Sequence, residues 1–241
     1  MAVSFDDRGY VLKKSKFGER DVVLQLFTAE HGRYAGLVKA GTARSKLPLL
    51  QIGNLLTCRW RARLLDQLGQ WDVEGERLMA GRLLTMKEPL LASASASDLV
   101  LAACGEREAM PVVFVALQKL YDALVHDPDW LETYIRFELV LLAEAGFALD
   151  LSKCAVTGTV DDLIWVSPKT GRAVSSDVGA AYADRLLPLP GFLAGNASFS
   201  LRDGLIGLRL SQFFLQRHIF DPLGRDLPAA RYQLQASLAP S

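Results

Sequence analysis

Apolar and polar side chains alternate with period two through much of the first 80 residues, and this alternation constrains the fold more than any other feature. The pattern is typical of half-buried β-strands. We expect a three-stranded meander within 9–40, where Gly18 ends the first run and residues 28–32 supply a hairpin loop, and further strands at 55–63 and 70–76. Five short strands at this spacing predict a small barrel.

After Arg82 the apolar residues recur at intervals of three and four, which is typical of amphipathic helices. Pro111 suits the first turn of a helix, and Gly146 suits a helix end. From Leu151 to Asp184, turn residues and short extended pieces indicate a small ribbon inserted among helices. We expect helices at 77–85, 95–103, 111–124, 130–145 and 205–220, and a frayed tail after Arg231.

The fold class predicted from these patterns is α+β with several domains. The expected order is a five-stranded barrel, the first part of a helical bundle, a ribbon-like insertion and the C-terminal part of the bundle. The corresponding segments are 1–80, 81–150, 151–185 and 186–241.

The composition excludes several classes of protein. In 241 residues, 50% are hydrophobic and 27 basic side chains offset 27 acidic ones, which excludes a disordered chain. No apolar run approaches the roughly 18 residues that a membrane span needs, and the opening residues lack a secretory signal. The three cysteines lie far apart and do not suit a disulfide framework. We therefore expect a cytoplasmic protein with no membrane partner.

The net charge of zero conceals an uneven distribution. Residues 1–82 carry 14 basic against 9 acidic side chains, residues 83–150 carry 4 against 11, and residues 151–241 carry 9 against 7. The excess lies early, since residues 1–63 hold 12 basic and 5 acidic side chains, and phosphate backbones attract such surfaces. The alternative is a solvated sheet face whose lysines keep edge strands soluble. Charge alone leaves both interpretations open.

Motifs for catalysis and for a metal are scarce. The sequence contains no phosphate-binding loop of the G-x-x-x-x-G-K-[ST] type, no G-x-G-x-x-G and no H-E-x-x-H, and its three histidines lack metal-ligand spacing. Cys154 opens a stretch that looks like half of a zinc knuckle, but Thr157, Ser175 and Val178 stand where three further cysteines would be expected. Since these side chains cannot replace thiolates, we predict no zinc and no other cofactor.

Several motifs together resemble the RecO family, the bacterial recombination mediators of the RecFOR pathway. The opening signature runs from Gly9-Tyr10-Val11-Leu12 through Gly18-Glu19-Arg20-Asp21 to Gly36-Leu37-Val38-Lys39-Ala40-Gly41. In the middle of the chain, Tyr134-Ile135-Arg136-Phe137-Glu138-Leu139 leads to Gly146-Phe147-Ala148-Leu149-Asp150-Leu151 and Cys154, and Ser167-Pro168 with Gly171 follows. The resemblance covers nearly all of the chain.

The resemblance implies an N-terminal OB-fold, a helical bundle and a degenerate zinc-ribbon-like insertion. Members of the family are non-enzymatic DNA repair proteins at the nucleoid that bind single- and double-stranded DNA and anneal complementary strands. They engage the C-terminal tail of single-strand binding protein, and with RecR they load RecA. Two other classes stay open, namely an RNA-binding OB-fold protein and an enzyme that cleaves nucleic acid with clustered carboxylates and metal.

The candidate DNA-binding residues are basic side chains of the predicted barrel: Lys13, Lys14, Lys16, Arg20, Lys39, Arg44, Lys46, Arg59, Arg61 and Arg63. The last three share one strand phase and repel one another unless an anion lies alongside, which we expect to be phosphate. Phe17 and Tyr34 are candidates for stacking on bases, although Tyr34 suits the barrel core better.

Candidate contacts outside the barrel are also basic. Arg136 is the candidate for the acidic tail of single-strand binding protein, the alternative being a surface pair with Glu132 four residues earlier. Arg225 and Arg231 are candidates for a second DNA contact.

Overall fold

The computed structural model describes residues 3–64, 66–195 and 198–239. Its contacts divide the chain into two compact units, one up to Asp127 and one from Pro128 onward. The four-segment division drawn from the sequence stays a prediction. Within the described residues, no helix is both long and apolar enough to cross a membrane.

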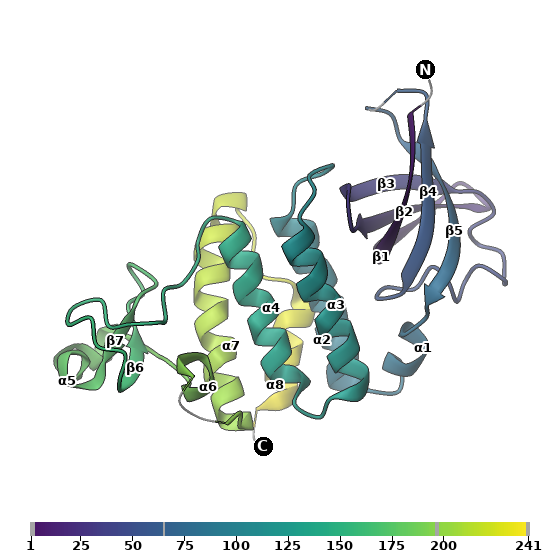
Figure 1. Ribbon diagram of the computed structural model, residues 1–241. Helices are drawn as coiled ribbons and strands as arrows, with labels where there is room; N and C mark the ends of the chain where they lie inside the picture. The colour runs from purple at the N-terminus through teal and green to yellow at the C-terminus, as the bar shows by residue number, and fades with distance from the viewer. Residues whose placement is uncertain (1–2, 65, 196–197, 240–241) are drawn as a thin grey trace. The chain divides into compact units, whose positions relative to one another are not determined.

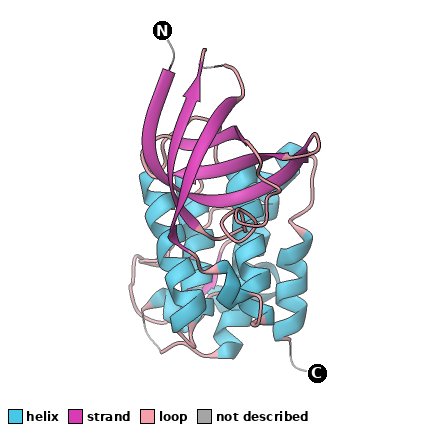
Figure 2. Ribbon diagram, turned by 90° about the vertical axis from the view of Figure 1, so that its right-hand side faces the viewer, coloured by secondary structure: helices cyan, strands magenta, loops and turns pink. Residues whose placement is uncertain are grey.

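The first unit opens with a closed five-stranded barrel, which confirms the predicted fold class (Figure 2). Its strands follow the order β1-β2-β3-β5-β4 and are antiparallel except for the β3–β5 pair, as in an OB-fold. Their bounds are β1 Val3–Phe17, β2 Asp21–Thr28, β3 Gly32–Val38, β4 Leu55–Ala62 and β5 Gly69–Arg77.

Two tryptophans fill the barrel, and two glycines make room for them. Trp60 and Trp71 are almost completely buried. A Cβ at Gly36 would lie 2.6 Å from the Trp71 ring, and one at Gly69 would lie 2.2 Å from the Trp60 ring. Strand β1 pairs with β4 from Val3 to Tyr10 and with β2 from Gly9 to Phe17, and a bulge between Val11 and Lys13 bends it.

Three helices complete the first unit: α1 Ala80–Leu83, α2 Lys87–Ala103 and α3 Pro111–His126. The Phe114 ring of α3 lies 5.4 Å from that of Tyr10 and 6.0 Å from that of Phe27, so α3 packs against β1 and β2. The predicted start of α2, at residue 95, is too late. Its first turns hold buried serines, which hid the apolar periodicity.

The connection between α2 and α3 lies against the turn between β2 and β3. Arg107 N donates a hydrogen bond to Arg33 O at 2.9 Å. Gly32 has a φ of +77°, and a Cβ placed on it would lie 1.8 Å from the carbonyl oxygen of Glu108. The turn therefore requires glycine for two independent reasons, its backbone conformation and the closeness of the neighbouring backbone.

We expect Gly32→Ala to lower the free energy of unfolding by more than about 2 kcal/mol, because left-handed strain of 1–2 kcal/mol adds to a clash with backbone. Gly18→Ala is the matched control, since Gly18 has a φ of +61° but nothing within 4 Å of an added Cβ. Urea denaturation of the three proteins measures the difference. Equal losses in the two variants would show that the Glu108 contact is unimportant.

The second unit combines helices with a small three-stranded sheet of order β7-β6-β8. Its longest helices, α4 Trp130–Glu144 and α7 Leu201–Leu215, lie side by side (Figure 1). The sheet strands are β6 Leu163–Val166, β7 Ala173–Ser175 and β8 Leu187–Pro188. The remaining elements are α5 Ser176–Gly179, a 3₁₀ segment Ala180–Arg185, α6 Gly191–Ala194, a π-helical turn Gln216–Phe220, a 3₁₀ turn Asp221–Leu223 and α8 Ala229–Leu238.

The expectation of a frayed tail after Arg231 is wrong, because α8 continues to Leu238. Two side chains of α8, Arg231 and Leu234, are completely buried and anchor the helix. The sequence pattern missed this helix because one of its two anchors is an arginine, which would ordinarily face solvent.

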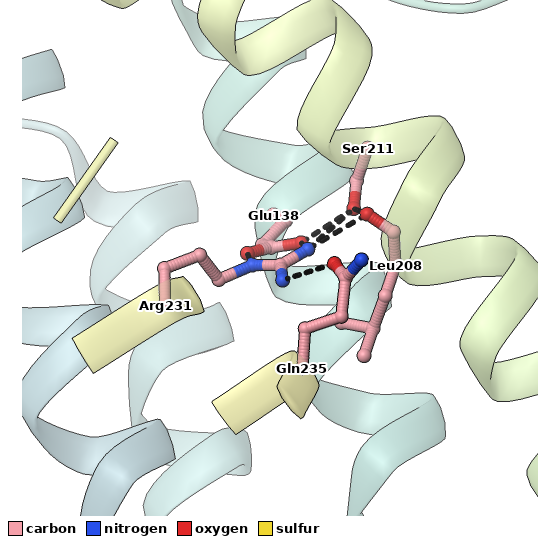
Figure 3. A network of polar contacts seen from close by, with 5 residues as sticks. All are labelled: Glu138, Leu208, Ser211, Arg231 and Gln235. Carbon is pink, nitrogen blue, oxygen red and sulfur yellow. Dashed lines mark hydrogen bonds and ion pairs between the residues drawn. The ribbon is translucent and has the colours of Figure 1, made fainter. Parts of the chain in front are cut away.

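Arg231 lies in a buried polar network (Figure 3). Its Nε donates to Glu138 Oε1 at 2.5 Å, and its Nη2 donates to Glu138 Oε2 at 3.2 Å and to Leu208 O at 2.8 Å. Ser211 Oγ donates to the same carboxylate at 2.5 Å, and Arg231 Nη1 donates to Gln235 Oε1 at 3.1 Å. Burial lowers the pKa of Arg231, but the Glu138 carboxylate outweighs it and keeps the pKa above its usual value. The suggested DNA contact at Arg231 is therefore wrong.

Candidate nucleic-acid interface

The hairpin formed by β1 and β2 projects a run of exposed residues. Beyond the bulge, every side chain from Lys13 to Arg20 is exposed. Strand alternation places Lys13 and Phe17 on one face of the hairpin, and Lys14 and Lys16 on the other. The hairpin thus presents cations on both faces.

A loop after β3 lies against the turn of this hairpin. Thr42 N and Oγ1 donate to Arg20 O at 3.1 and 3.0 Å, and Ala40 N donates to Asp21 Oδ1 at 2.8 Å. These bonds bring the loop cations Lys39 and Arg44 to the end of the hairpin. We call the resulting cluster the basic tip; its members are Lys13, Lys14, Lys16, Arg20, Lys39 and Arg44.

The basic tip keeps its cations available. All six side chains are exposed, and within the described ranges none forms an ion pair at 4 Å or less. Glu19 and Asp21 lie in the same turn and offset part of the charge, but Asp21 already accepts the Ala40 amide. Lys46 differs from the six, since it is half-buried and its Nζ donates to Lys39 O at 2.8 Å.

The two aromatic candidates for stacking have different environments. Phe17 is 53% exposed at the end of β1, beside the turn. Tyr34 is only 7% exposed, and its ring lies 4.9 Å from that of Phe5 and 5.2 Å from that of Trp60 in the barrel core. Phe17 is therefore the accessible ring, and Tyr34 is a core residue.

The arginines of β4 already have anions beside them. Arg59 forms a two-point ion pair with Asp6 on β1, at 2.6 and 3.0 Å, and Arg61 is paired with Asp72 on β5. The hydrogen bond from Arg59 holds the pKa of Asp6 below its usual value. Carboxylates of the same sheet thus relieve the repulsion that we expected phosphate to relieve. Arg63 lies just beyond β4 and is exposed.

Arg136 is also engaged within the chain. It is paired with Glu132 at 2.8 Å, its Nη2 donates to Phe192 O at 3.0 Å, and its guanidinium lies 5.6 Å from the centre of the Phe192 ring. The ion pair with Glu132 is the one that the sequence analysis gave as the alternative to a contact with the acidic tail. The bond to Phe192 additionally connects Arg136 to α6. Its side chain is nevertheless half exposed.

The positions suggested for a zinc site hold a different donor set. Cys154 is buried, and Ser175 N donates to its Sγ at 3.4 Å. The Ser175 hydroxyl oxygen lies 3.3 Å from the sulfur and 2.5 Å from Asp177 Oδ1, and its one proton can be donated to either of them. Thr157 also donates to the sulfur through its hydroxyl and its amide. One thiol with two hydroxyls does not fit tetrahedral zinc, and the described residues contain no group of three or more His, Cys, Asp or Glu that could hold a metal ion.

We expect the Cys154 thiol to titrate near pH 6. Burial raises its pKa, but the hydrogen bonds from Ser175 and Thr157 outweigh burial and lower it to about 6 from 9.0. The folded state then binds fewer protons than the unfolded state between these values. The contribution of Cys154 to the free energy of unfolding therefore increases from pH 6 to pH 9, and it is lost as the pH falls through 6.

Ultraviolet absorbance of the thiolate measures this titration. Cys58 serves as an internal comparison, because burial raises its pKa to about 12. Cys154→Ser should abolish the transition, and Ser175→Ala should move it to higher pH. A wild-type protein with no thiolate signal at neutral pH would contradict the expectation.

Comparison with known proteins agrees with the barrel and the helices described above. A family model described as "Recombination protein O N terminal" matches residues 1–75, and one described as "Recombination protein O C terminal" matches residues 88–226. The chain belongs to the RecO family. This confirms the family inferred from the sequence motifs and assigns the chain to DNA repair and recombination.

RecO-family relatives match along almost their whole length. The chain is 44% identical over 238 residues to the DNA repair protein RecO of Phenylobacterium zucineum, covering 96% of each. It is 44% identical over 231 residues to that of Rhodospirillum centenum, covering 95% of this chain and 92% of the relative. With the protein of Rhizobium rhizogenes the identity is 40% over 231 residues, covering 95% and 89%.

For this RecO-family chain, sequence reasoning missed the residues that organise the interface. Thr42 joins the loop to the hairpin, and its hydroxyl gave no signal in a segment rich in small polar residues. Asp6 and Asp72 were missed as partners of the β4 arginines. The strand alternation did place both carboxylates on the outer face of the barrel. Recognising them as partners of the β4 arginines required knowing that β1 and β5 flank β4.

Proposed function

We propose that this RecO-family protein is a non-enzymatic recombination mediator that binds single- and double-stranded DNA through the basic tip. The observation that carries the proposal is the basic tip itself: six exposed cations on the hairpin and on the loop bonded to its turn, free of ion pairs in the described part of the chain, with Phe17 exposed at the end of β1. Phosphate contacts supply affinity without reading sequence, and an exposed ring gives a base a stacking surface.

Annealing follows from the same chemistry. Two complementary strands repel each other through their phosphates, and a protein that neutralises phosphates on both strands lowers this barrier. The hairpin carries Lys13 on one face and Lys14 and Lys16 on the other, so its cations point toward two sides. Two strands held on these sides would meet near the turn, where Phe17 lies.

We further propose the partners that the family resemblance implies. These are the C-terminal tail of single-strand binding protein, for which Arg136 stays the candidate, and RecR, which acts with this protein in loading RecA. Arg59, Arg61 and Arg63 remain candidate DNA contacts, and so does Lys46, which lines a cavity together with Arg59. Arg59 and Arg61 would have to exchange a carboxylate for a phosphate. The protein would act in the cytoplasm at the nucleoid, without zinc or another cofactor.

The test is annealing of complementary strands coated with the cognate single-strand binding protein, with and without its acidic tail, in the presence of a chelator. Tail-dependent annealing without metal supports the proposal. Equal annealing with and without the tail would contradict the proposed contact with the tail. Preferential binding of RNA over single-stranded DNA in competition would indicate the RNA-binding alternative. Strand cleavage that requires magnesium would indicate an enzyme.

A further inference from the structure

The connection between α2 and α3 lies across one end of the barrel. Residues 104–110 form this connection, which we call the strap. Arg107 N donates to Arg33 O at 2.9 Å, and Glu106 pairs with Arg33 in an isolated parallel bridge, so the strap runs beside the start of β3. Arg107 Nη2 also lies 3.5 Å from Gln67 O, in the loop between β4 and β5. The strap therefore contacts both β3 and the β4–β5 loop.

This position is important for nucleic-acid binding by an OB-fold. In such barrels the face of the second and third strands and the β1–β2 and β4–β5 loops hold oligonucleotides. Here the β1–β2 loop belongs to the basic tip, beside which Val22 pairs with Val38. The strap meets the opposite end of the same two strands, where Thr28 pairs with Gly32. A single strand of DNA that extends from the basic tip along β2 and β3 would therefore reach the strap.

Arg107 covers aromatic rings at this end of the barrel. Its guanidinium lies 5.5 Å from the centre of the Tyr34 ring and 6.0 Å from that of the Trp60 ring. The half-buried Phe5 ring stacks on His31 at 3.9 Å and lies 4.9 Å from Tyr34. A guanidinium over an aromatic face occupies the surface on which a base would stack. The strap thus covers a group of rings that could hold an unpaired base.

The strap also changes the charge of the strand face. The side chain of Arg33 is only 15% exposed, its Nε donates to Cys104 O at 3.2 Å, and its Nη1 lies 3.6 Å from a carboxylate oxygen of Glu106. Glu106 and Glu108 are themselves exposed. The strap therefore keeps Arg33 from a phosphate and places two carboxylates where a phosphate would lie, which repels it. Opening of the strap would reverse both effects.

The backbone of the strap is strained at Arg107. Its φ is +62°, in the left-handed region that an arginine rarely adopts. A residue stays in this conformation only when its surroundings hold it there, in this case the bond to Arg33 O and the contacts with the two rings. Since Arg107 is exposed, a ligand can reach these contacts, and their release would relieve the strain.

We propose that the strap is an autoinhibitory segment that covers a stacking surface for unpaired nucleobases, and that single-stranded DNA displaces Arg107 from the rings. The open barrel then offers Tyr34 and the released Arg33 to the strand, in continuity with the basic tip. The bases of a duplex are already paired and stacked, so opening favours single strands over duplexes. This inference rests on the proposed DNA binding through the basic tip and adds its regulation.

Arg107→Ala tests the proposal by the sign of its effect, because loss of an exposed cation ordinarily weakens DNA binding. Here the affinity for a single-stranded oligonucleotide should increase by about two- to fivefold, which corresponds to losing one exposed cation–π contact. The affinity for the duplex of the same sequence should change less. Fluorescence anisotropy with the full-length chain measures both. Arg82→Ala is the matched control, since it removes an exposed arginine that contacts His126 at the other end of α3, and it should not increase affinity.

Hydrogen exchange of the wild-type chain measures the opening without any substitution. The Arg107 amide is bonded to Arg33 O in the closed strap. Peptides that contain residues 104–110 should therefore exchange faster when the single-stranded oligonucleotide is bound, as expected for local opening. Unchanged or slower exchange in the complex would overturn the proposal, and so would unchanged or weaker oligonucleotide binding by Arg107→Ala.

Neutralising the basic tip distinguishes failure of this inference from failure of the proposed function. If the wild-type chain binds DNA and the tip variant loses binding, but Arg107→Ala gives no gain, the strap is only a structural connection and the proposed function stands. If neutralising the tip leaves DNA binding unchanged, the proposed function fails at its own site, whatever the strap does.

Discussion

Replacing Arg231 by methionine should lower the free energy of unfolding of the second unit by about 3–5 kcal/mol. The substitution leaves the Glu138 carboxylate completely buried and removes its partner guanidinium, so that among the described residues only the Ser211 hydroxyl still donates to it. The cost of a buried unpaired charge, not the lost attraction alone, makes the effect large. Urea denaturation followed by circular dichroism of the helices measures it.

Two further variants separate this cause from a general effect of losing an arginine. Arg225→Met removes an exposed guanidinium from the same region and should change stability little. Glu138→Leu combined with Arg231→Met removes both charges and should recover most of the stability, because replacing a buried ion pair by apolar residues is often neutral. A double variant as unstable as Arg231→Met would show that packing, not charge, explains the loss.

Neutralising four cations of the basic tip should weaken binding of single-stranded DNA by about two orders of magnitude at moderate salt. The variant replaces Lys13, Lys16, Arg20 and Arg44 by glutamine. Each lost phosphate contact reduces the slope of log affinity against log salt by about 0.7, so the slope should become shallower by up to about 3. A salt titration of binding by anisotropy measures both quantities.

The comparison variant is Arg59→Gln with Arg61→Gln. These arginines are already paired with Asp6 and Asp72, so losing them should reduce affinity less than losing the tip cations. An unchanged affinity and slope in the tip variant would remove the tip from the DNA site. A larger loss of DNA affinity in the β4 variant would place the DNA site on β4, where phosphate would displace the carboxylates.

The barrel was predictable because its information is local. Each strand carries its own alternation, and the turns between strands carry Gly18 and Gly32, both with positive φ. The β4 arginines illustrate what was not predictable: Asp6 precedes Arg59 by more than fifty positions, and only the closed strand order places β1 beside β4. The alternating arginines were correctly recognised as needing an anion, but its source was tertiary.

Helix α8 and the basic tip also depended on tertiary contacts that the sequence does not reveal. Arg231 carries the residue type of a surface position, and only its pairing with Glu138, 93 positions away, explains why it is buried. The tip cations were all named from the sequence, because exposed lysines at a hairpin end need no tertiary partner. The approach of the loop cations Lys39 and Arg44 to the hairpin depended on bonds from Thr42 and Ala40, which no sequence pattern indicates.

The contact of the α2–α3 connection with the β2–β3 turn bears on how this protein can be divided. Tyr10 and Phe27 face Phe114, and Gly32 touches the backbone at Glu108, so the barrel loses part of its own covering if the chain is cut near residue 80. An isolated barrel fragment would expose these rings to water. Nucleic-acid binding measured with such a fragment would not represent binding by the intact barrel. A fragment intended to keep the barrel native should extend through α3, to Asp127.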